Sequence, residues 1–476
     1  MEPFWKESLN RRAAQPRRCR WKNYGDGHQQ AAPNADESDS FLNCPACGHT
    51  VRMALDRSPW DMDPRAAELL EKLQLMPLQR RCNRPAVAFL LVALTLASCA
   101  KDPGPTEVPV AADCDPRVAT VTSTAPGRLL VGYTPYGPNW VTPDFTFVRQ
   151  HSSVISLHTV VNSKVPWDIF LGDYKSLATY DADLKRDAPA WRNTLCALRS
   201  QSYPRPIYLS EEFLLDRGKG PHMLPPRLDG TYPAEFLIGG FSTYRSPAAR
   251  KAAANLARYL VEFFQPIAFS PFIEFDLTGR GRQLDQEWVG MTDAYHDIYV
   301  EAKKWKTTLN PDGIPIFPTF MWNLVQSAEK GGELRFGYNL IRSVAAKAPI
   351  DWMGLSMYPN SEFNFGNILL KPAQIDAKFV EDARRVFNDS RPITISETGW
   401  QVCSANGCFE NDQLAYTQWL VSEGKRLSMP FLINFFETDP IFTGPTGSIT
   451  LPFGFRTAAP ELRHRPALGV FDAQLP

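Results

Sequence analysis

Eight short apolar runs, spaced along the chain from about residue 128, most constrain what this sequence can fold into. Each run has the length and the β-branched or aromatic content of a buried strand, and longer segments separate them. In chain order the runs read RLLVGYTPYG, SVISLHTVV, RPIYLSEEF, IAFSPFIEFDL, IPIFPTFMWN, DWMGLSMYP, RPITISETGW and PFLINFFETD. A regular alternation of strand and helix predicts a parallel sheet covered by helices.

Three of the connecting segments have a helical period: 247–264, 286–305 and 411–427. In the first of them, the apolar side chains that fall on one helical face are Leu256, Tyr259, Leu260 and Phe263. Ser246 precedes the first segment and Asn411 begins the third, and both residue types are favoured N-caps. We therefore expect helices over these ranges.

Eight strand–helix units over roughly 350 residues predict a (β/α)8 TIM barrel, which usually needs ~250 residues plus insertions. The alternative is an open doubly wound sheet. That fold would normally carry a glycine-rich turn after its first strand, and GYTPYG is not such a turn. No clear amphipathic helix follows the eighth run before Pro476, so we expect the last helix of the barrel to be short or missing.

Acidic residues at the ends of the fourth and seventh runs are the candidate catalytic groups, because TIM barrels place catalysis at the carboxyl ends of strands. The strand predicted within the seventh run ends in Glu397. In the fourth run, alternation puts Phe272, Glu274 and Asp276 on one face and apolar residues on the other. We expect Glu274 and Asp276 to point into the barrel mouth. The alternative is that these acids form structural salt bridges with Arg or Lys.

Two carboxylates from the fourth and seventh strands would supply what glycoside hydrolysis needs. One acid protonates the leaving oxygen, and the other attacks the anomeric carbon or activates water. A separation of about 5–5.5 Å between the carboxyl groups would indicate retention, and ~6.5–9.5 Å would indicate inversion. His158 lies at the end of the second predicted strand and Asn323 lies after the fifth, so both are candidates for sugar contacts, although a histidine at such a place is more often structural.

The segment ISETGW, 395–400, resembles the strand-seven nucleophile motif of the clan A superfamily of retaining glycoside hydrolases with (β/α)8 barrels. It is most similar to the endo-β-1,4-galactanase type. DWMGLSMYP resembles the sixth strand of those enzymes, which reads like D-x-x-G-x-S-x-Y-P, and LGVFDAQLP resembles a G-L-F-D stretch near their ends. Only these short runs carry the sequence resemblance.

The resemblance implies that Glu397 is the nucleophile, that Glu274 is the acid/base and that Tyr358 lies near the nucleophile. It also implies a sugar-stacking wall made by Trp400 or Trp322, and core packing is the alternative for these indoles.

One departure from the superfamily affects the acid/base. An asparagine directly precedes that glutamate in the superfamily, whereas Ile273 stands there in this chain. Asp276 would be the replacement, either as a sugar contact or as the acid.

A signal of lipoprotein type lies inside the chain. Residues 76–101 read MPLQRRCNRPAVAFLLVALTLASCAK, in which arginines precede an apolar run, 86–97, and small residues lead to Cys99. The run is too short for a comfortable transmembrane helix. LASC resembles the lipobox of bacterial lipoproteins, and the resemblance implies that Cys99 carries the lipid. We expect a lipid-anchored protein of the bacterial cell envelope, at the outer membrane or cell surface.

That signal predicts how the chain is organised. Residues 1–75 are a disordered extension of the gene model, and residues 76–99 are the signal peptide. A Pro-rich tether at 100–126 then leads to the barrel at 127–476. The alternative is that Met1 is the true start and that 86–97 belongs to an internal anchor. Cys403 and Cys408 bracket the loop CSANGC and could form a disulfide in an oxidising compartment.

The chain has 51 basic and 51 acidic residues, and this balance gives no reason to expect a nucleic-acid partner. No sequence motif indicates a nucleotide, another cofactor or a catalytic metal. We expect a monomer that acts on a carbohydrate substrate and contacts the membrane through its N-terminal lipid. The alternatives to a glycoside hydrolase are a lipoprotein that binds glycan on the same barrel without cleaving it, and a structural lipoprotein of the envelope.

Overall fold

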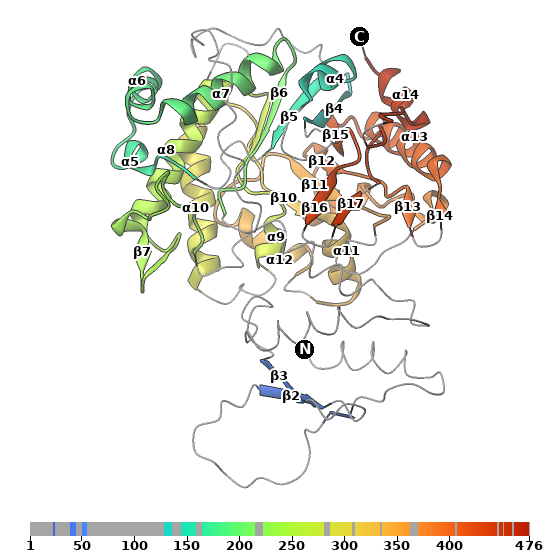
Figure 1. The fold of residues 1–476 in the computed structure, drawn as a ribbon, viewed down its shortest axis with the longest axis horizontal. Helices are drawn as coiled ribbons and strands as arrows, with labels where there is room; N and C mark the ends of the chain where they lie inside the picture. Colours follow the sequence, from blue (N-terminus) through green and yellow to red (C-terminus); the bar gives the residue numbers. More distant parts are fainter. Residues whose placement is uncertain are drawn as a thin grey trace. The chain divides into compact units, whose positions relative to one another are not determined.

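Eight parallel strands close into a barrel in this computed structural model (Figure 1). They are β4 (Leu130–Thr134), β5 (Val154–His158), β6 (Ile207–Ser210), β9 (Ala268–Ser270), β10 (Thr319–Met321), β11 (Met353–Met357), β12 (Ile393–Thr398) and β15 (Phe431–Phe436). Neighbours along the chain are neighbours in the sheet, and β15 pairs with β4. A parallel bridge between Phe269 and Ile316 joins β9 to the segment before β10. All eight predicted strands and the (β/α)8 barrel are therefore confirmed.

The structure describes residues 128–135, 144–158, 164–214, 222–279, 286–306, 310–333, 336–361, 370–404, 407–444, 447–450, 452–458 and 461–475, together with three short strands nearer the N-terminus. The chain divides into two units, 1–85 and 86–476. In the first unit, β1 (Lys22–Asn23), β2 (Asp39–Asn43) and β3 (Thr50–Ala54) form an antiparallel sheet, which the sequence does not lead us to expect. The predicted signal, Cys99 and the tether lie outside the described residues.

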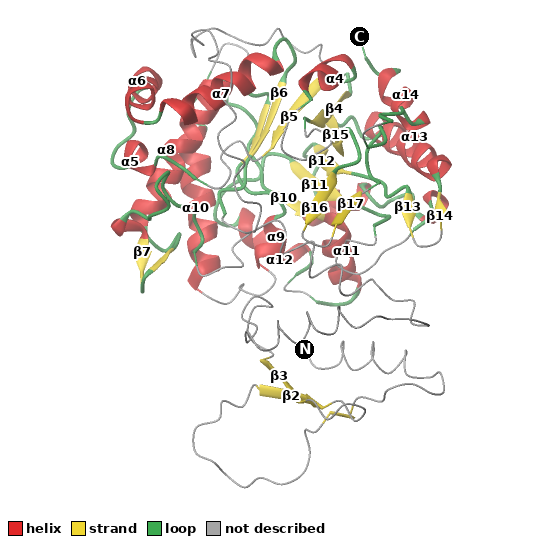
Figure 2. Ribbon diagram, in the orientation of Figure 1, coloured by secondary structure: helices red, strands yellow, loops and turns green. Residues whose placement is uncertain are grey.

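Helices surround the barrel strands, as Figure 2 shows in red. They are α4 (Phe145–Gln150), α5 (Trp167–Phe170), α6 (Leu177–Asp187), α7 (Pro189–Ser202), α8 (Pro247–Phe264), α9 (Phe275–Gly279), α10 (Gln286–Ala302), α11 (Trp322–Lys330), α12 (Tyr338–Ala345), α13 (Glu410–Arg426) and α14 (Pro466–Asp472). Within the described residues, no helix is both long enough and apolar enough to cross a membrane.

The predicted helix starts are right in one case and wrong in the other. Ser246 caps α8, because its hydroxyl accepts a hydrogen bond from the Ala249 amide at 3.2 Å. The prediction for Asn411 is wrong. Helix α13 begins at Glu410, so Asn411 lies inside the first turn, and the N-cap residue is Phe409, which has no side-chain cap bond. The last barrel helix, α14, has seven residues and is short, as predicted.

Small elements lie in the segments that follow the barrel strands. The paired strands are β7 (Leu237–Ile238) with β8 (Phe241–Ser242), β13 (Cys403–Ser404) with β14 (Gly407–Cys408), and β16 (Ile441–Gly444) with β17 (Gly447–Thr450). Short 3-10 helices cover Ala234–Phe236, Pro372–Gln374 and Glu381–Val386. In Figure 1, α9 and the β16–β17 hairpin lie toward the lower end of the barrel strands.

Aromatic side chains fill the interior of the barrel. The Tyr208 ring lies 4.6 Å from Phe431 and stacks on Phe317 at 6.2 Å between ring centroids. Gly354 makes room for this packing, since a Cβ at that position would come within 2.5 Å of the Phe317 ring. The glycine of the D-x-x-G segment therefore has a packing reason, and the barrel is closed by side chains beneath the polar groups at its mouth.

Candidate active site

Glu397 lies near the carboxyl end of β12, and its side chain is 9% exposed. The Tyr358 hydroxyl donates a hydrogen bond to its Oε1 atom at 2.5 Å, and Nε2 of His158 lies 4.0 Å from Oε2. These three residues come from the ends of strands β12, β11 and β5. The charge of Glu397 also acts inside the barrel, because burial first, and then the Glu397 carboxylate, raise the pKa of Tyr208.

The local sequence explains how Tyr358 reaches Glu397. A Cβ on Gly399 would approach atoms of the Tyr358 and Phe453 rings at 3.1 Å, so the glycine lets the tyrosine lie close over the chain. The Tyr358 amide donates a hydrogen bond to Oδ1 of Asn323 at 3.1 Å. Asn323, proposed above as a sugar contact, therefore holds the backbone of Tyr358.

Glu274 lies beyond the end of β9, and the residue is 2% exposed. The Ser356 hydroxyl donates a hydrogen bond to its Oε1 atom at 2.6 Å. Ser356 is also the residue that pairs with Glu397 in the β11–β12 ladder, where adjacent strands are ~4.8 Å apart. Ser356 thus places the two carboxylates in one neighbourhood at the carboxyl end of the barrel.

The prediction that Glu274 belongs to a regular strand was wrong. Strand β9 ends at Ser270, and a turn and α9 follow, so strand alternation does not apply to Phe272, Glu274 and Asp276. Glu274 has a φ of +47°, in the left-handed region. A left-handed residue is invisible to a pattern of apolar and polar residues, so the pattern carried the predicted strand past Ser270, where β9 ends.

Asp276 lies in α9 and is fully buried. Its Oδ1 atom accepts a hydrogen bond from the Met321 amide at 2.7 Å, which pins α9 to the end of β10. This contact gives Asp276 a structural part in the turn, whereas the sequence proposed it as an alternative acid or a sugar contact.

The two tryptophans proposed as a stacking wall lie in the hydrophobic core. Trp322 is 0% exposed, stacks on Tyr338 and donates a hydrogen bond from Nε1 to the Phe379 carbonyl at 2.6 Å. Trp400 is 1% exposed and packs on Tyr416, with 4.8 Å between ring centroids. Neither indole presents a face to solvent, so the proposed wall is wrong and the core-packing alternative holds.

A separate apolar group of six residues, here called the mouth cluster, surrounds Tyr358. Its members are Met321, Leu324, Tyr358, Phe435, Phe436 and Phe453. Phe435 also packs edge-on against the His158 ring at 4.9 Å. The sequence did not single out these phenylalanines, because nothing in the run NFFETD distinguishes a mouth position from a core position.

Two further acids at strand ends were missed. Glu211 directly follows β6 and Glu437 directly follows β15, and both are fully buried. The Glu211 amide donates a hydrogen bond to the Ser270 carbonyl at 2.7 Å. The rule that selected Glu397, an acid at the end of an apolar run, would have found both in YLSEEF and NFFETD.

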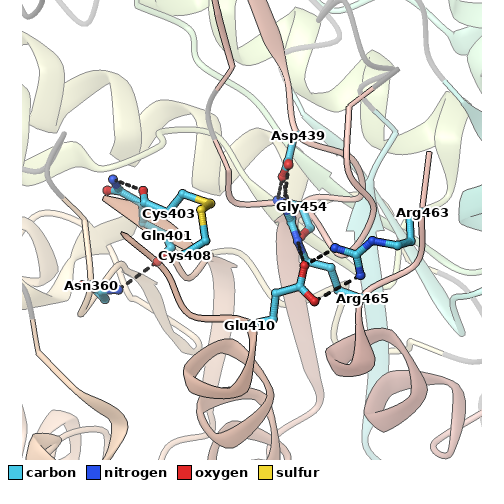
Figure 3. Close-up of a disulfide and its surroundings, with 9 residues drawn as sticks. All are labelled: Asn360, Gln401, Cys403, Cys408, Glu410, Asp439, Gly454, Arg463 and Arg465. Atoms are coloured by element: carbon cyan, nitrogen blue, oxygen red, sulfur yellow. Dashed lines mark hydrogen bonds and ion pairs between the residues drawn. A yellow bond between two sulfur atoms is a disulfide. The ribbon is translucent and has the colours of Figure 1, made fainter. Parts of the chain in front are cut away.

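The segments beyond β12 and β15 are fastened by a disulfide and by charged pairs, as Figure 3 shows. Cys403 and Cys408, the predicted pair, are joined across β13 and β14. Arg465 donates two hydrogen bonds to Asp439, at 2.7 and 2.5 Å. The Gly454 amide donates to Asp439 at 2.8 Å, which fixes the chain next to Phe453. These contacts hold one wall of the mouth cluster.

Known proteins offer similarity in structure only. No family model matches the sequence, and no curated protein matches it. The β-glycosidase of the hyperthermophile Thermosphaera aggregans is 13% identical with a TM-score of 0.43, and the match covers 69% of this chain and 83% of that one. A psychrophilic family 10 endo-β-1,4-xylanase is 13% identical over 72% of this chain and 96% of that one, with a TM-score of 0.42. A hyperthermophilic β-glucosidase mutant is 11% identical over 73% of this chain and 100% of that one, with a TM-score of 0.46.

Proposed function

We propose that this protein is a glycoside hydrolase that cleaves a β-linked polysaccharide or oligosaccharide by a two-carboxylate, retaining mechanism. One observation carries the proposal. Two buried carboxylates, Glu274 and Glu397, lie at the carboxyl end of one barrel, and hydroxyl groups of β11 and its end, Ser356 and Tyr358, hold them. Paired acids at this end of a TIM barrel are the arrangement that glycoside hydrolysis requires.

In this mechanism the protonated Glu274 gives its proton to the glycosidic oxygen as the bond to the anomeric carbon breaks. The Glu397 carboxylate attacks that carbon and forms a glycosyl ester. Glu274 then takes a proton from water, and the hydroxide releases the sugar from Glu397 with retained configuration. Tyr358, which donates to Oε1 of Glu397, orients the nucleophile.

A second candidate function is glycan binding without cleavage. Ile273, buried at 2% exposure, stands where the superfamily places an asparagine next to the acid/base. A sugar 2-hydroxyl would then lose a contact that strengthens in the transition state. For either function, β-1,4-galactan is the first substrate to test, because the motifs ISETGW and DWMGLSMYP resemble those of the endo-β-1,4-galactanases.

The proposed location is the bacterial cell envelope, with Cys99 as the lipidated residue. Besides the lipobox-like LASC, the disulfide between Cys403 and Cys408 and the disulfide-bonded state of Cys196 support an oxidising compartment. Mass spectrometry of the N-terminal peptide tests the anchor. A diacylglyceryl group on Cys99 that disappears in Cys99→Ser is expected, and an unmodified chain beginning at Met1 would refute it.

The test of activity is incubation of the purified protein with a panel of plant and microbial glycans, β-1,4-galactan among them. Glu397→Gln should abolish cleavage and retain binding. Glu274→Gln should lose cleavage of natural glycans, whereas Asp276→Asn, the matched change of a buried neighbouring acid, should keep it. Binding by the wild type without cleavage of any glycan would favour the second function.

A further inference from the structure

Glu274 has a backbone conformation that non-glycine residues rarely adopt. Its φ is +47°, in the left-handed region. Four other non-glycine residues in the described part of the chain have positive φ: Gln265, Asn388, Ser428 and Leu462. All four are exposed or half-buried, whereas Glu274 is buried. Buried residues in this region persist only where the surroundings hold them, and such residues gather at functional sites.

Two hydroxyl groups from neighbouring strands contact Glu274 on its backbone and on its side chain. Oγ1 of Thr319, on β10, accepts a hydrogen bond from the Glu274 amide at 2.8 Å. Oγ of Ser356, on β11, donates to the carboxylate at 2.6 Å. Thr319 is 2% exposed and Ser356 is 0% exposed, so water does not replace either contact easily.

The chain around Glu274 follows β10 although it is no longer a strand. The Thr319 amide donates to the Phe272 carbonyl at 2.9 Å, before Glu274, and the Met321 amide donates to Asp276 at 2.7 Å, after it. The bond from the Glu274 amide to Thr319 lies between these two. The backbone is therefore fixed on both sides of Glu274, and the Thr319 hydroxyl satisfies the buried Glu274 amide.

We infer that Thr319 and Ser356 are positioning residues that hold Glu274 in its left-handed conformation and aim its carboxyl group at the leaving-group oxygen. The inference rests on the proposed function, since it assigns Glu274 the acid/base role. Thr319 sets the backbone, and Ser356 selects the orientation of the carboxyl group.

The first test needs no substrate. Unfolding in denaturant is measured for the full chain and for Ser356→Ala, Glu274→Met and the double variant. Residues in contact should be coupled. The equilibrium constant for unfolding of the double variant should therefore be about fivefold smaller than the value expected if the effects of the two single changes were additive. Ser202→Ala with Glu274→Met is the matched control, because the Ser202 hydroxyl bonds the Leu198 carbonyl in α7. Additive effects of Ser356→Ala and Glu274→Met would overturn the inference.

The second test uses aryl β-glycosides of the sugar that the wild type cleaves, from phenyl to 2,4-dinitrophenyl. Poor leaving groups need the proton and good ones do not. In kcat/KM, Thr319→Val and Ser356→Ala should therefore lose at least ~10-fold on phenyl glycosides and less than ~3-fold on dinitrophenyl glycosides. Thr319→Ser should restore the wild-type pattern, because it keeps the hydroxyl.

Thr394→Val is the matched control for Thr319→Val, since the Thr394 hydroxyl bonds the Phe431 carbonyl on a neighbouring barrel strand. It should change all the aryl glycosides equally or not at all. An equal loss on all leaving groups in Thr319→Val and Ser356→Ala would overturn the positioning role. If the wild type cleaves none of the glycosides, the proposed hydrolase fails, and the unfolding cycle alone decides whether Ser356 holds Glu274.

Discussion

Replacing Tyr358 by phenylalanine removes a single hydroxyl from the candidate nucleophile and leaves the packing of the mouth cluster in place. The ring lies 6.1 Å from Phe453 and touches Gly399, and both contacts remain in Tyr358→Phe. The lost group is a donor at 2.5 Å to a carboxylate, and both residues are buried. A hydrogen bond to a charged group contributes ~1.5–3 kcal/mol.

If that contribution is realised in the transition state, kcat falls by roughly 10- to 150-fold, since each 1.36 kcal/mol is a factor of ten. The KM should change little, because the hydroxyl contacts Glu397 and not the sugar ring. Steady-state kinetics on an activated aryl β-glycoside measure both constants. Tyr416→Phe is the matched control: its buried hydroxyl lies 2.5 Å from the neutral Thr398 hydroxyl.

Tyr416→Phe should lower stability without a comparable loss in kcat. A Tyr358→Phe enzyme with the kcat of the wild type would refute the assignment of Tyr358 and Glu397 as a working pair. An equal loss of kcat in both variants would show that the effect comes from general loosening of the β11–β12 end.

Three further predictions concern the barrel that carries the site. Gly354→Ala should destabilise by ~1–3 kcal/mol in denaturant unfolding, because its Cβ meets a packed ring, whereas Gly469→Ala in the open face of α14 should stabilise by about 0.5–1 kcal/mol. Trp322→Phe should cost about 1 kcal/mol more than Trp400→Phe, because the Nε1 of Trp400 has no hydrogen-bond acceptor among the described residues. Equal costs would contradict that. Burial opposes the ionisation of Asp144, yet hydrogen bonds from the Arg456 guanidinium and a helix amide lower the pKa of that carboxyl. Asp144→Asn should therefore destabilise the protein above pH ~4, where the carboxylate is charged in both the folded and the unfolded chain. The stability difference between wild type and variant should fade as the pH falls below the pKa of Asp144 in the unfolded chain, because the carboxylate is protonated as the pH falls through its pKa in the folded chain. A difference that persists at pH 2 would contradict the charge argument.

Periodicity predicted the strands well because the barrel strands lie in short, largely apolar runs that longer segments separate. It predicted α8 for the same reason, since Ser246 offers both a cap and a clear start. The fourth strand shows the limit of the method. Its apolar run continues through Phe272 and Phe275, but β9 ends at Ser270 and Glu274 adopts a left-handed conformation. The Glu274 amide donates a hydrogen bond to a threonine 45 residues away in the chain, Thr319, and no local pattern reports such a partner.

Sequence reasoning proposed two acids at the carboxyl end of the barrel, Glu274 and Glu397, and missed Glu211, Glu437 and the mouth cluster. Glu397 stands out because a carboxylate at the end of a buried strand is costly without a purpose. The tryptophans next to the site gave no such signal, since an indole packs equally well in a core or on a sugar. The mouth cluster instead draws phenylalanines from two segments, 435–436 and 453, which come together only when β15 and the following chain have folded.

The most direct measurement of the central claim is covalent trapping of the glycosyl intermediate. The protein is incubated with a 2-deoxy-2-fluoro β-glycoside that carries a dinitrophenyl leaving group, digested and examined by mass spectrometry. We predict one sugar per chain, as an ester on the peptide that contains Glu397, and no label in Glu397→Gln. Label on another acid such as Glu211 or Glu437, or rapid dinitrophenol release with inverted product and no label on any peptide, would contradict the claim that Glu397 is the nucleophile of a retaining glycosidase.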